Sequence, residues 1–111
     1  EIDEKNSNYH FLKGFSNLSL NNLNNAEKNF TSAININDKN SSFYFYRGLT
    51  HHKLNKFSEA VIDYNKAITL KPTSPEYYNN LAQIYYINGK NDQAIDNFIK
   101  SVNLNNNSTT S

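Results

Sequence analysis

Residues 74–85 read Ser-Pro-Glu-Tyr-Tyr-Asn-Asn-Leu-Ala-Gln-Ile-Tyr, and this stretch decides the fold. Its start has the features of a helix N-terminus. Ser74 can cap the helix, Pro75 suits its first position, and Glu76 interacts favourably with the positive end of the helix dipole. One helical face then carries one small residue among large ones: Tyr78, Leu81, Ala82 and Tyr85. The lone alanine predicts a point where another backbone comes close.

The small and aromatic positions of this stretch belong to a 34-residue repeat, as the spacing of Gly14, Gly48 and Ala82 shows (48 − 14 and 82 − 48). Three further sets of residues follow the same period: Ala26, Ala60 and Ala94; Phe30, Tyr64 and Phe98; and Ala33, Ala67 and Ser101. All six alanines of the chain fall in these positions. Because alanine is scarce in this composition, chance does not explain the placement. The repeat is real.

Each copy of the repeat predicts two helices joined by a short turn. The turns fall at residues 21–22, 55–56 and 88–89, and the copies are separated by turns at 37–40 and at Lys71-Pro72. Proline ends the preceding helix because it restricts its predecessor and has no backbone donor. Serine or aspartate is the predicted cap of four helices: Ser41 or Ser42, Ser58, Ser74 and Asp92.

These elements predict an all-α domain over residues 7–104. Its three units are residues 7–40, 41–74 and 75–104. Each unit is too small to bury its apolar face alone, so stacking three of them makes the core. We expect residues 1–6 to be frayed and residues 105–111 to form a disordered polar tail.

Asparagine dominates the composition, with 22 of 111 residues. It is a mediocre helix former, roughly 0.6 kcal/mol worse than alanine per residue. The helices must therefore be held by packing rather than by propensity.

Length and charge exclude several classes of protein. The 111 residues make one domain or part of one, and because residue 1 is glutamate we expect a piece of a longer protein. A net charge of +1 gives no footprint for nucleic acid or an acidic membrane surface. No apolar run approaches the ~20 residues that span a bilayer. The start is not a signal peptide, and we expect a cytoplasmic, intracellular location, although the absence of cysteine leaves the redox compartment open.

The repeated positions resemble the tetratricopeptide repeat (TPR) family, whose pattern is an aromatic, Leu-Gly, a tyrosine, Ala-x-x-x-Phe, another alanine and a closing proline. The third copy has Tyr78-x-x-Leu81-Ala82-x-x-Tyr85 and Ala94-x-x-x-Phe98. The second has Tyr44-x-x-Arg47-Gly48-x-x-His51, Ala60-x-x-x-Tyr64, Ala67 and Pro72. The first has His10-x-x-Lys13-Gly14-x-x-Asn17, Ala26-x-x-x-Phe30 and Ala33. Four normally apolar positions depart from the pattern: Lys13, Asn17, Arg47 and His51.

The resemblance covers roughly residues 7–106 and implies a right-handed solenoid of six antiparallel helices. It also implies a non-enzymatic protein-binding or peptide-binding module that acts as a scaffold or adaptor. The ligand would lie in a concave groove lined by the first helix of each pair. The implied groove residues are Phe11, Phe15, Phe45, Leu49, His52, Asn79, Asn80, Gln83 and Tyr86. Such a groove, aromatic at one end and rich in amides at the other, suits an extended peptide. The alternative places Phe11, Phe15 and Phe45 in the core between repeats.

A subgroup of the family binds acidic C-terminal tails of chaperones through cations on the first helices. The corresponding positions hold Phe11, Phe15, Tyr46, Glu76 and Asn80. No cation faces a ligand carboxylate here, and Glu76 would repel one. We therefore expect a protein or peptide partner that is not an acidic chaperone tail.

The last helix has an apolar stripe of Ile95, Ile99 and Val102 at spacings of four and three. Burying each of these side chains is worth roughly 1.5–3 kcal/mol, and solenoid ends normally carry a polar capping helix. We expect another repeat, a partner or a second copy of the chain to cover the stripe. Self-association into a dimer or array is thus the alternative function.

No residue pattern points to catalysis, to a metal or to a cofactor. His51 and His52 are adjacent, so their rings point about 100° apart on a helix and cannot chelate one ion well. We expect His51 to be structural. There is no Ser/His/Asp arrangement and no phosphate-binding glycine loop. Binding of single-stranded RNA fits poorly, because the groove lacks cations.

Overall fold

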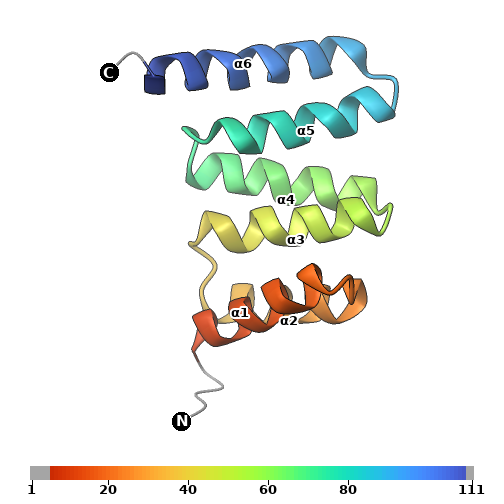
Figure 1. Ribbon diagram of the computed structural model, residues 1–111, viewed down its shortest axis with the longest axis vertical. Coiled ribbons are helices and arrows are strands. Elements are labelled where there is room, and N and C mark those ends of the chain that lie inside the picture. The colour runs from red at the N-terminus through yellow and green to blue at the C-terminus, as the bar shows by residue number, and fades with distance from the viewer. Residues whose placement is uncertain (1–5, 110–111) are drawn as a thin grey trace.

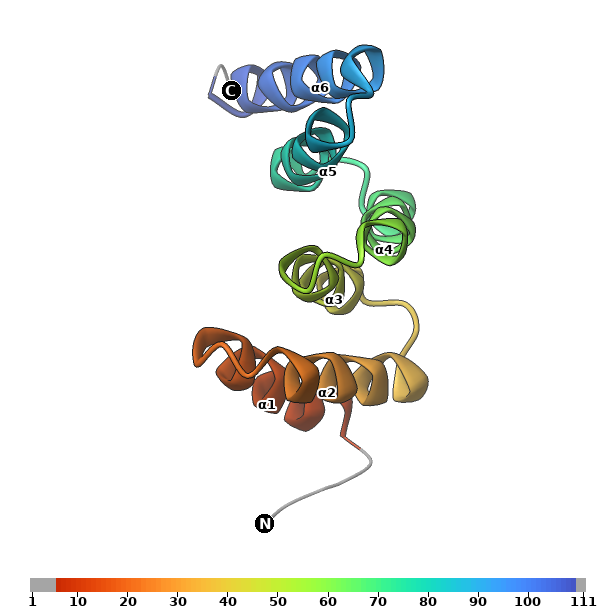
Figure 2. The same ribbon diagram turned by 90° about the vertical axis from the view of Figure 1, so that its right-hand side faces the viewer.

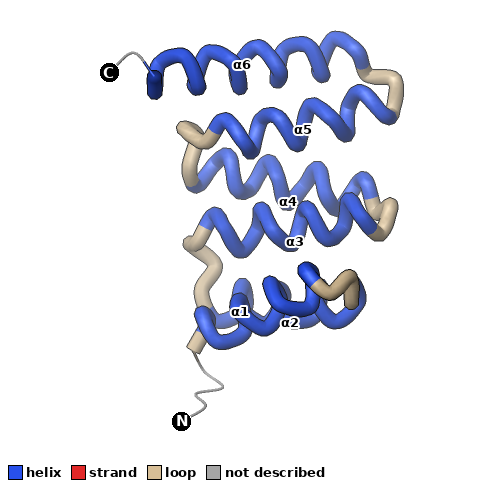
Figure 3. The backbone as a smooth tube through the Cα atoms, viewed as in Figure 1, coloured by secondary structure: helices blue, strands red, loops and turns tan. Residues whose placement is uncertain are grey.

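The computed structural model describes residues 6–109, which form helices and the turns between them (Figures 1 and 3). The helices are α1 (Ser7–Ser19), α2 (Leu23–Ile36), α3 (Ser41–Lys53), α4 (Phe57–Leu70), α5 (Pro75–Ile87) and α6 (Asn91–Thr109). They form three antiparallel pairs, one for each copy of the repeat. The prediction of an all-α solenoid of three helix-turn-helix repeats is confirmed.

The pairs stack along the long axis of a molecule that measures 45 × 34 × 22 Å. Helix α2 packs on α3, and α4 packs on α5, so the second helix of each pair receives the first helix of the next. The first helices also touch, α1 against α3 and α3 against α5. Figure 2 shows α3 and α5 on one side of the stack and α4 on the other. We call the surface that α1, α3 and α5 share the first-helix face.

Glycine and alanine set the distance within each pair. A Cβ atom on Gly14 would lie 2.7 Å from the Phe30 ring, and one on Gly48 would lie 2.9 Å from the Tyr64 ring. Both rings are fully buried, so neither can move aside. In the third copy Ala82 is tolerated at the same position and is itself fully buried. The close contact predicted at the small residues is therefore present at Gly14 and Gly48, although a side-chain ring makes it and not another backbone.

The hydrophobic core is continuous from α2 to α5. Its buried members are Ala33, Ile34, Phe43, Tyr44, Phe45, Ala60, Tyr64, Ala67, Tyr77, Leu81 and Ile84. Helix α6 adds only Ala94 and Ser101 to the buried side chains of the described chain. The end of the stack is therefore much less buried than its middle.

The turn inside each pair has the same backbone conformation in all three copies. Asn21, Asn55 and Gly89 adopt positive φ angles of 64°, 63° and 78°. Glycine adopts this conformation freely, and asparagine tolerates it better than most residues. The amide that follows each residue donates to a carbonyl five residues earlier, as Lys56 does to His51 at 2.8 Å. These bonds satisfy helix C-terminal carbonyls.

Asparagine, rather than serine, provides the side-chain N-cap hydrogen bonds of α1 and α3. The side chains of Asn6 and Asn40 accept hydrogen bonds from the backbone amides of Asn8 and Ser42, both at 2.9 Å. Ser74 occupies the N-cap of α5 but makes no side-chain capping bond.

The other predicted caps were wrong. Ser41 and Ser42 lie inside α3, Ser58 lies inside α4, and Asp92 lies in the first turn of α6. Asparagine caps as well as serine does, and its abundance hid the signal.

The boundaries of the domain also differ at both ends from those predicted. Asn6 caps α1, and residues 1–5 lie outside the described residues. Helix α6 continues to Thr109, so the prediction of a disordered tail from residue 105 was wrong for 105–109, and 110–111 lie outside the described residues. Residues 105–109 contain neither proline nor glycine, so no residue there interrupts the helix.

Candidate functional site

Three aromatic side chains form a cluster on the first-helix face, between α1 and α3. We call Phe11, Phe15 and Tyr46 the aromatic cluster. The Tyr46 ring lies edge-to-face with Phe15 at 5.5 Å and with Phe11 at 5.6 Å between centroids. Phe15 is 44% exposed, whereas Phe11 and Tyr46 are half-buried. The cluster thus offers an open aromatic surface on a packed base.

The two other phenylalanines predicted for the groove lie deeper than Phe15. Phe11 also contacts Phe30 at 5.7 Å and Phe43 at 5.1 Å, so part of its ring belongs to the core. Phe45 is only 3% exposed and stacks on Tyr77 at 4.8 Å. Its predicted exposure in the groove was wrong, because its position faces the next repeat. The alternative, burial between repeats, holds for Phe45.

The middle of the first-helix face is formed by α3. Leu49 is half-buried there. His52 is also half-buried, but its ring packs edge-on against Phe57 at 5.9 Å, at the start of α4. Burial, together with the nearby Lys53 charge, lowers the pKa of His52. The ring is therefore neutral at pH 7 and lies toward α4.

The four predicted polar and aromatic residues of α5 divide between two surfaces. The Asn80 side-chain amide donates to the Glu76 carbonyl at 2.9 Å, and Gln83 and Tyr86 are exposed, Tyr86 by 68%. Asn79, by contrast, lines a depression with Ser101 and Val102 of α6. Asn79 therefore belongs to the end of the stack.

The repeat period arranges the remaining residues in two rows across the first-helix face. Phe15, Leu49 and Gln83 occupy equivalent positions in the three copies, and Tyr46 and Asn80 occupy another equivalent pair. Sequence reasoning omitted Tyr46 from the groove. The period could have found it, because it stands one repeat before Asn80, which was included.

The first-helix face has an acidic residue near the aromatic cluster. Burial and then the Glu76 carboxylate raise the pKa of Tyr46. Two basic side chains of the first helices have contacts elsewhere: Arg47 binds Asp63 at 2.8 Å, and Lys13 lies 5.2 Å from the centre of the Tyr9 ring. The local field therefore favours a neutral or cationic ligand over an anionic one.

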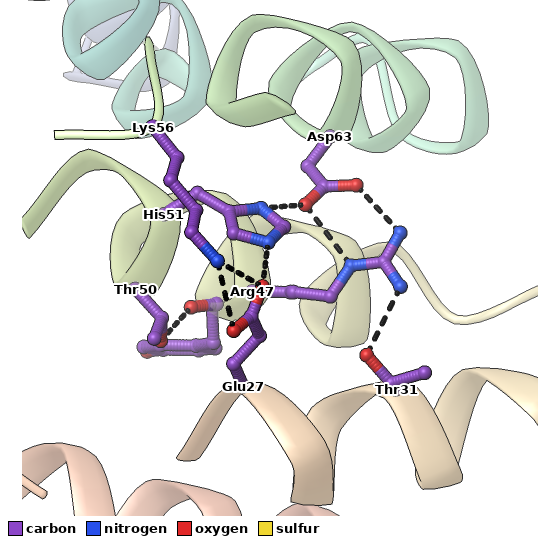
Figure 4. A network of polar contacts seen from close by, with 8 residues as sticks. Glu27, Thr31, Arg47, Thr50, His51, Lys56 and Asp63 are labelled. Carbon is purple, nitrogen blue, oxygen red and sulfur yellow. Dashed lines mark hydrogen bonds and ion pairs between the residues drawn. The ribbon is translucent and has the colours of Figure 1, made fainter. Parts of the chain in front are cut away.

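The unexpected polar residues Arg47 and His51 share the partner Asp63 and also bind residues of the first repeat (Figure 4). Arg47 donates to both carboxylate oxygens of Asp63 at 2.8 and 3.0 Å and to the Thr31 hydroxyl at 3.3 Å. His51 bridges two carboxylates, with Nδ1 at 2.8 Å from Asp63 and Nε2 at 2.7 Å from Glu27. We call these five residues the polar network.

The polar network fixes its own protonation state. Burial alone would lower the pKa of His51, but the hydrogen bonds to Asp63 and Glu27 outweigh burial and raise it. Burial likewise acts to raise the pKa of Glu27, and the bonds from His51 and Lys56 outweigh it and lower that pKa. The imidazolium and the carboxylate therefore stabilise each other. These contacts connect α2, α3 and α4, which makes the network structural.

The stripe of Ile95, Ile99 and Val102 lies on the outer surface of α6. These side chains are 54%, 52% and 55% exposed. Ile99 and Val102 line a shallow depression with Phe98 and Asn103. The stripe is therefore an exposed apolar surface at the end of the stack.

Two classes of site are absent from the described part of the chain. Residues 6–109 contain no group of three or more His, Cys, Asp or Glu side chains that could hold a metal ion. None of their helices is both long and apolar enough to cross a membrane.

Family comparison agrees with the stacked helix pairs. A model described as "Tetratricopeptide repeat" matches residues 7–40 and 75–108, and one described as "TPR repeat" matches residues 50–88. The chain belongs to the tetratricopeptide repeat family. Repeats of this family are in general non-catalytic protein-interaction modules. A search of curated proteins found no match.

Solved structures of the same fold are similar over nearly the whole chain. A crystal structure of MamA has a TM-score of 0.95 and 21% identity, covering 98% of this chain and 64% of that one. The TPR2B domain of yeast Sti1, in complex with pHsp70, has a TM-score of 0.89 and 22% identity, covering 94% and 83%. The Arabidopsis OM64 TPR domain has a TM-score of 0.87 and 22% identity, covering 91% and 84%. The chain thus spans less than two thirds of the MamA chain.

Proposed function

We propose that this chain is a non-enzymatic scaffold or adaptor module that binds an extended peptide of a partner protein along the first-helix face. The observation that supports this most directly is the exposed Phe15 ring on the packed aromatic cluster. Rigid aromatic anchors of this kind dominate binding energy in protein interfaces. A side chain of the peptide would pack on Phe15 and Tyr46.

The rest of the first-helix face supplies groups for a peptide backbone. Gln83 is exposed, and the Asn80 side-chain oxygen is an acceptor whose amide is already oriented by the Glu76 carbonyl. Leu49 lies between them and the aromatic cluster, in the same row as Phe15 and Gln83. An extended peptide would therefore meet an apolar anchor first and amides farther along.

The partner peptide is not an acidic chaperone tail. The Sti1 structure shows a related domain in complex with pHsp70. In this chain the first-helix positions that would carry cations in the tail-binding subgroup hold Phe11, Phe15, Tyr46, Glu76 and Asn80. The Glu76 carboxylate, close enough to affect Tyr46, opposes a ligand carboxylate. A peptide with neutral or basic residues beside an aromatic or aliphatic one fits this surface.

A displayed peptide library selected against the chain tests the proposal. Selected peptides should bind about five- to thirtyfold more weakly to Phe15→Ala, which removes an anchor worth about 1–2 kcal/mol. Ile62→Ala is the matched control, since Ile62 is 67% exposed on α4, away from the first-helix face. Equal loss in both variants, or peptides unaffected by Phe15→Ala, would reject the first-helix face.

A second candidate function is assembly through α6. The observation in its favour is the apolar stripe, three side chains that are each more than half exposed. The chain would then join a larger array or complex through its last helix. Ile99→Glu should abolish that assembly and leave peptide binding on the first-helix face intact. Assembly that survives Ile99→Glu would count against this role.

A further inference from the structure

Three of the residue contacts at the first join between repeats come from equally spaced positions of α3. Helix α3 presents Phe43, Arg47 and His51, one on each successive turn. Phe43 lies 5.1 Å from Phe11 of α1 between ring centroids. Arg47 donates to Thr31 of α2 at 3.3 Å, and His51 meets Glu27 of α2 at 2.7 Å. The first helix of a repeat thus contacts the preceding repeat through its residues at i, i+4 and i+8. It runs antiparallel to the second helix of that preceding repeat.

The second join uses the same positions with different chemistry. The Tyr77 ring stacks on Phe45 at 4.8 Å, which repeats the contact of Phe43 with Phe11. The next two positions of the incoming helix hold Leu81, which is 2% exposed, and Tyr85. Tyr85 lines a depression together with Val61, which stands one repeat after Glu27. At the first join the two sides match in polarity, and at the second join they match at the first and third positions, whereas Leu81 stands opposite the exposed Asn65.

The end of the stack presents the same receiving positions without an incoming helix among the described residues. They hold Asn79, Ile99 and Ile95, which stand one repeat after Phe45, Asn65 and Val61. Asn79 lines an open depression with Ser101 and Val102, and the two isoleucines are 52% and 54% exposed. This surface continues a contact that the chain makes twice already, and its chemistry is polar at the first position and apolar at the other two.

We propose that this surface docks one amphipathic helix of a partner protein, antiparallel to α6, with a polar residue at i and apolar residues at i+4 and i+8. The proposal rests on the second candidate function, assembly through α6, and names its partner. The polar residue would pair with the Asn79 amide, and the two apolar residues would cover Ile99 and Ile95. Asparagine, serine or threonine fits the first position, and leucine or tyrosine fits the other two.

A second copy of the chain is a poor occupant in head-to-tail stacking. Its α1 would be the incoming helix and would present Tyr9, Lys13 and Asn17 at the three positions. Lys13 would then be buried against Ile99, and Asn17 against Ile95. Burial of an unpaired ammonium group on an apolar surface is strongly unfavourable. The polarity of α1 therefore argues against an open array of identical copies.

Two synthetic peptides test the proposal against the complete chain. The matched peptide has the sequence of residues 75–88 with Tyr77→Asn, which places Asn, Leu81 and Tyr85 at the three positions. The mismatched peptide carries Leu81→Arg and Tyr85→His in addition, the pair found in α3. Because isolated short helices are marginal in water, a lactam bridge on the far face holds both peptides helical. Fluorescence anisotropy should show at least tenfold tighter binding of the matched peptide.

Two variants of the chain place the binding on α6. Ile99→Glu should reduce binding of the matched peptide at least tenfold, whereas Ile62→Glu, on exposed α4 surface, should leave it unchanged. Both side chains are more than half exposed, so both variants should fold, and far-ultraviolet circular dichroism checks this. Equal binding of the two peptides, or binding that survives Ile99→Glu, would overturn the proposal.

Sedimentation of the free chain separates this proposal from the assembly function itself. A monomer that binds the matched peptide supports both. A dimer that Ile99→Glu dissociates, with no peptide binding, would overturn the helix proposal and leave assembly through α6 standing, with a symmetric second copy as occupant. A monomer that binds neither peptide would overturn both.

Discussion

The join between the first and second repeats is polar, whereas the join between the second and third is apolar, although both use the same positions of the repeat unit. At the first join Arg47 and His51 meet Asp63, Glu27 and Thr31. At the second join the equivalent incoming positions hold Leu81 and Tyr85, which belong to the hydrophobic core or pack against it.

The helices of neighbouring repeats meet through the same positions at both joins, whereas the residue types at these positions differ. Small residues and large rings set the helix separation within the first and second repeats. The positions at the joins differ in chemistry, mainly polar at the first join and mainly apolar at the second. A departure from the family pattern at Arg47 is therefore tolerated because Asp63 compensates for it.

Removing the central carboxylate should have the largest effect on stability. Asp63→Ala leaves Arg47 and His51 without their shared partner, and breaking a buried ion pair costs about 3–5 kcal/mol. Urea denaturation measures the loss in free energy of unfolding. Asn97→Ala is the control, since Asn97 stands one repeat after Asp63 and its side chain only donates to a carbonyl on the helix surface. A loss below about 1 kcal/mol for Asp63→Ala would show that the polar network contributes little.

Replacing the residues of the first join by those of the second should leave the free energy of unfolding unchanged or raise it. The change should be smaller than the loss in Asp63→Ala. The variant carries Glu27→Val, Arg47→Leu, His51→Tyr and Asp63→Asn, each residue taken from the equivalent position of the next repeat. Replacing a whole buried charged cluster by well-packed apolar residues is often neutral or stabilising by about 1–4 kcal/mol. Urea denaturation at low and high salt checks both stability and the loss of salt dependence. A destabilised variant would mean that the polar network has no apolar substitute here.

The ring beneath Gly48 offers a test at a position close to both joins. Tyr64 is fully buried, and its hydroxyl has no hydrogen-bond partner among the described residues, whereas the equivalent residues are Phe30 and Phe98. Tyr64→Phe should raise the free energy of unfolding by about 1 kcal/mol, because an unsatisfied buried hydroxyl is unfavourable.

Thermal denaturation measures this effect against a matched control. Tyr44→Phe removes a hydroxyl that donates to the Asp38 carbonyl at 3.2 Å, so it should lower stability by about 1 kcal/mol. A similar change in both variants would contradict the assignment.

His51 and His52 should change the free energy of unfolding in opposite directions as pH changes. This is the smallest of the expected effects. The pKa of His51 is raised in the folded chain, so its contribution is complete below the ordinary histidine pKa of about 6.5 and is lost as pH rises through the folded value. The pKa of His52 is lowered, so stability is lost as pH falls below about 6.5.

Melting temperatures of His51→Gln and His52→Gln, compared with the parent chain, check this prediction. The deficit of His51→Gln should shrink as pH rises above neutrality, because the charged state that the variant lacks is then lost from the parent chain as well. His52→Gln should gain on the parent chain as pH falls. Parallel profiles for the two variants would contradict the opposite shifts.

The sequence allowed the fold to be predicted because its signal is repeated. Gly14, Gly48 and Ala82 stand at one position of the three copies, and each has a large ring or a close neighbour that requires a small residue. The apolar stripe on α6 was predicted from its spacing of four and three, and among the equivalent upstream residues Glu27, Thr31 and Asn65 are polar. That another helix or protein covers this stripe stays a prediction.

The polar join and part of the groove could not be predicted from single positions. Arg47 and His51 stood in apolar positions, and their partners lie 12 to 24 residues away on other helices. Only the stacked helices show that these residues compensate for one another. Phe45 failed as a groove residue because its helical face is shared between the groove and the next repeat, where Tyr77 covers it.

Each repeat packs only against the repeats next to it, and this affects the speed and order of folding. Within the described chain, each helix contacts helices one or two places away. Contacts of such short sequence separation close small loops at low entropic cost, so the chain should fold rapidly. Unfolding should start at the α6 end, which buries least, while α3 and α4 open last. Amide hydrogen exchange would then be a gradient along the stack, from fast in α6 to slow in the middle.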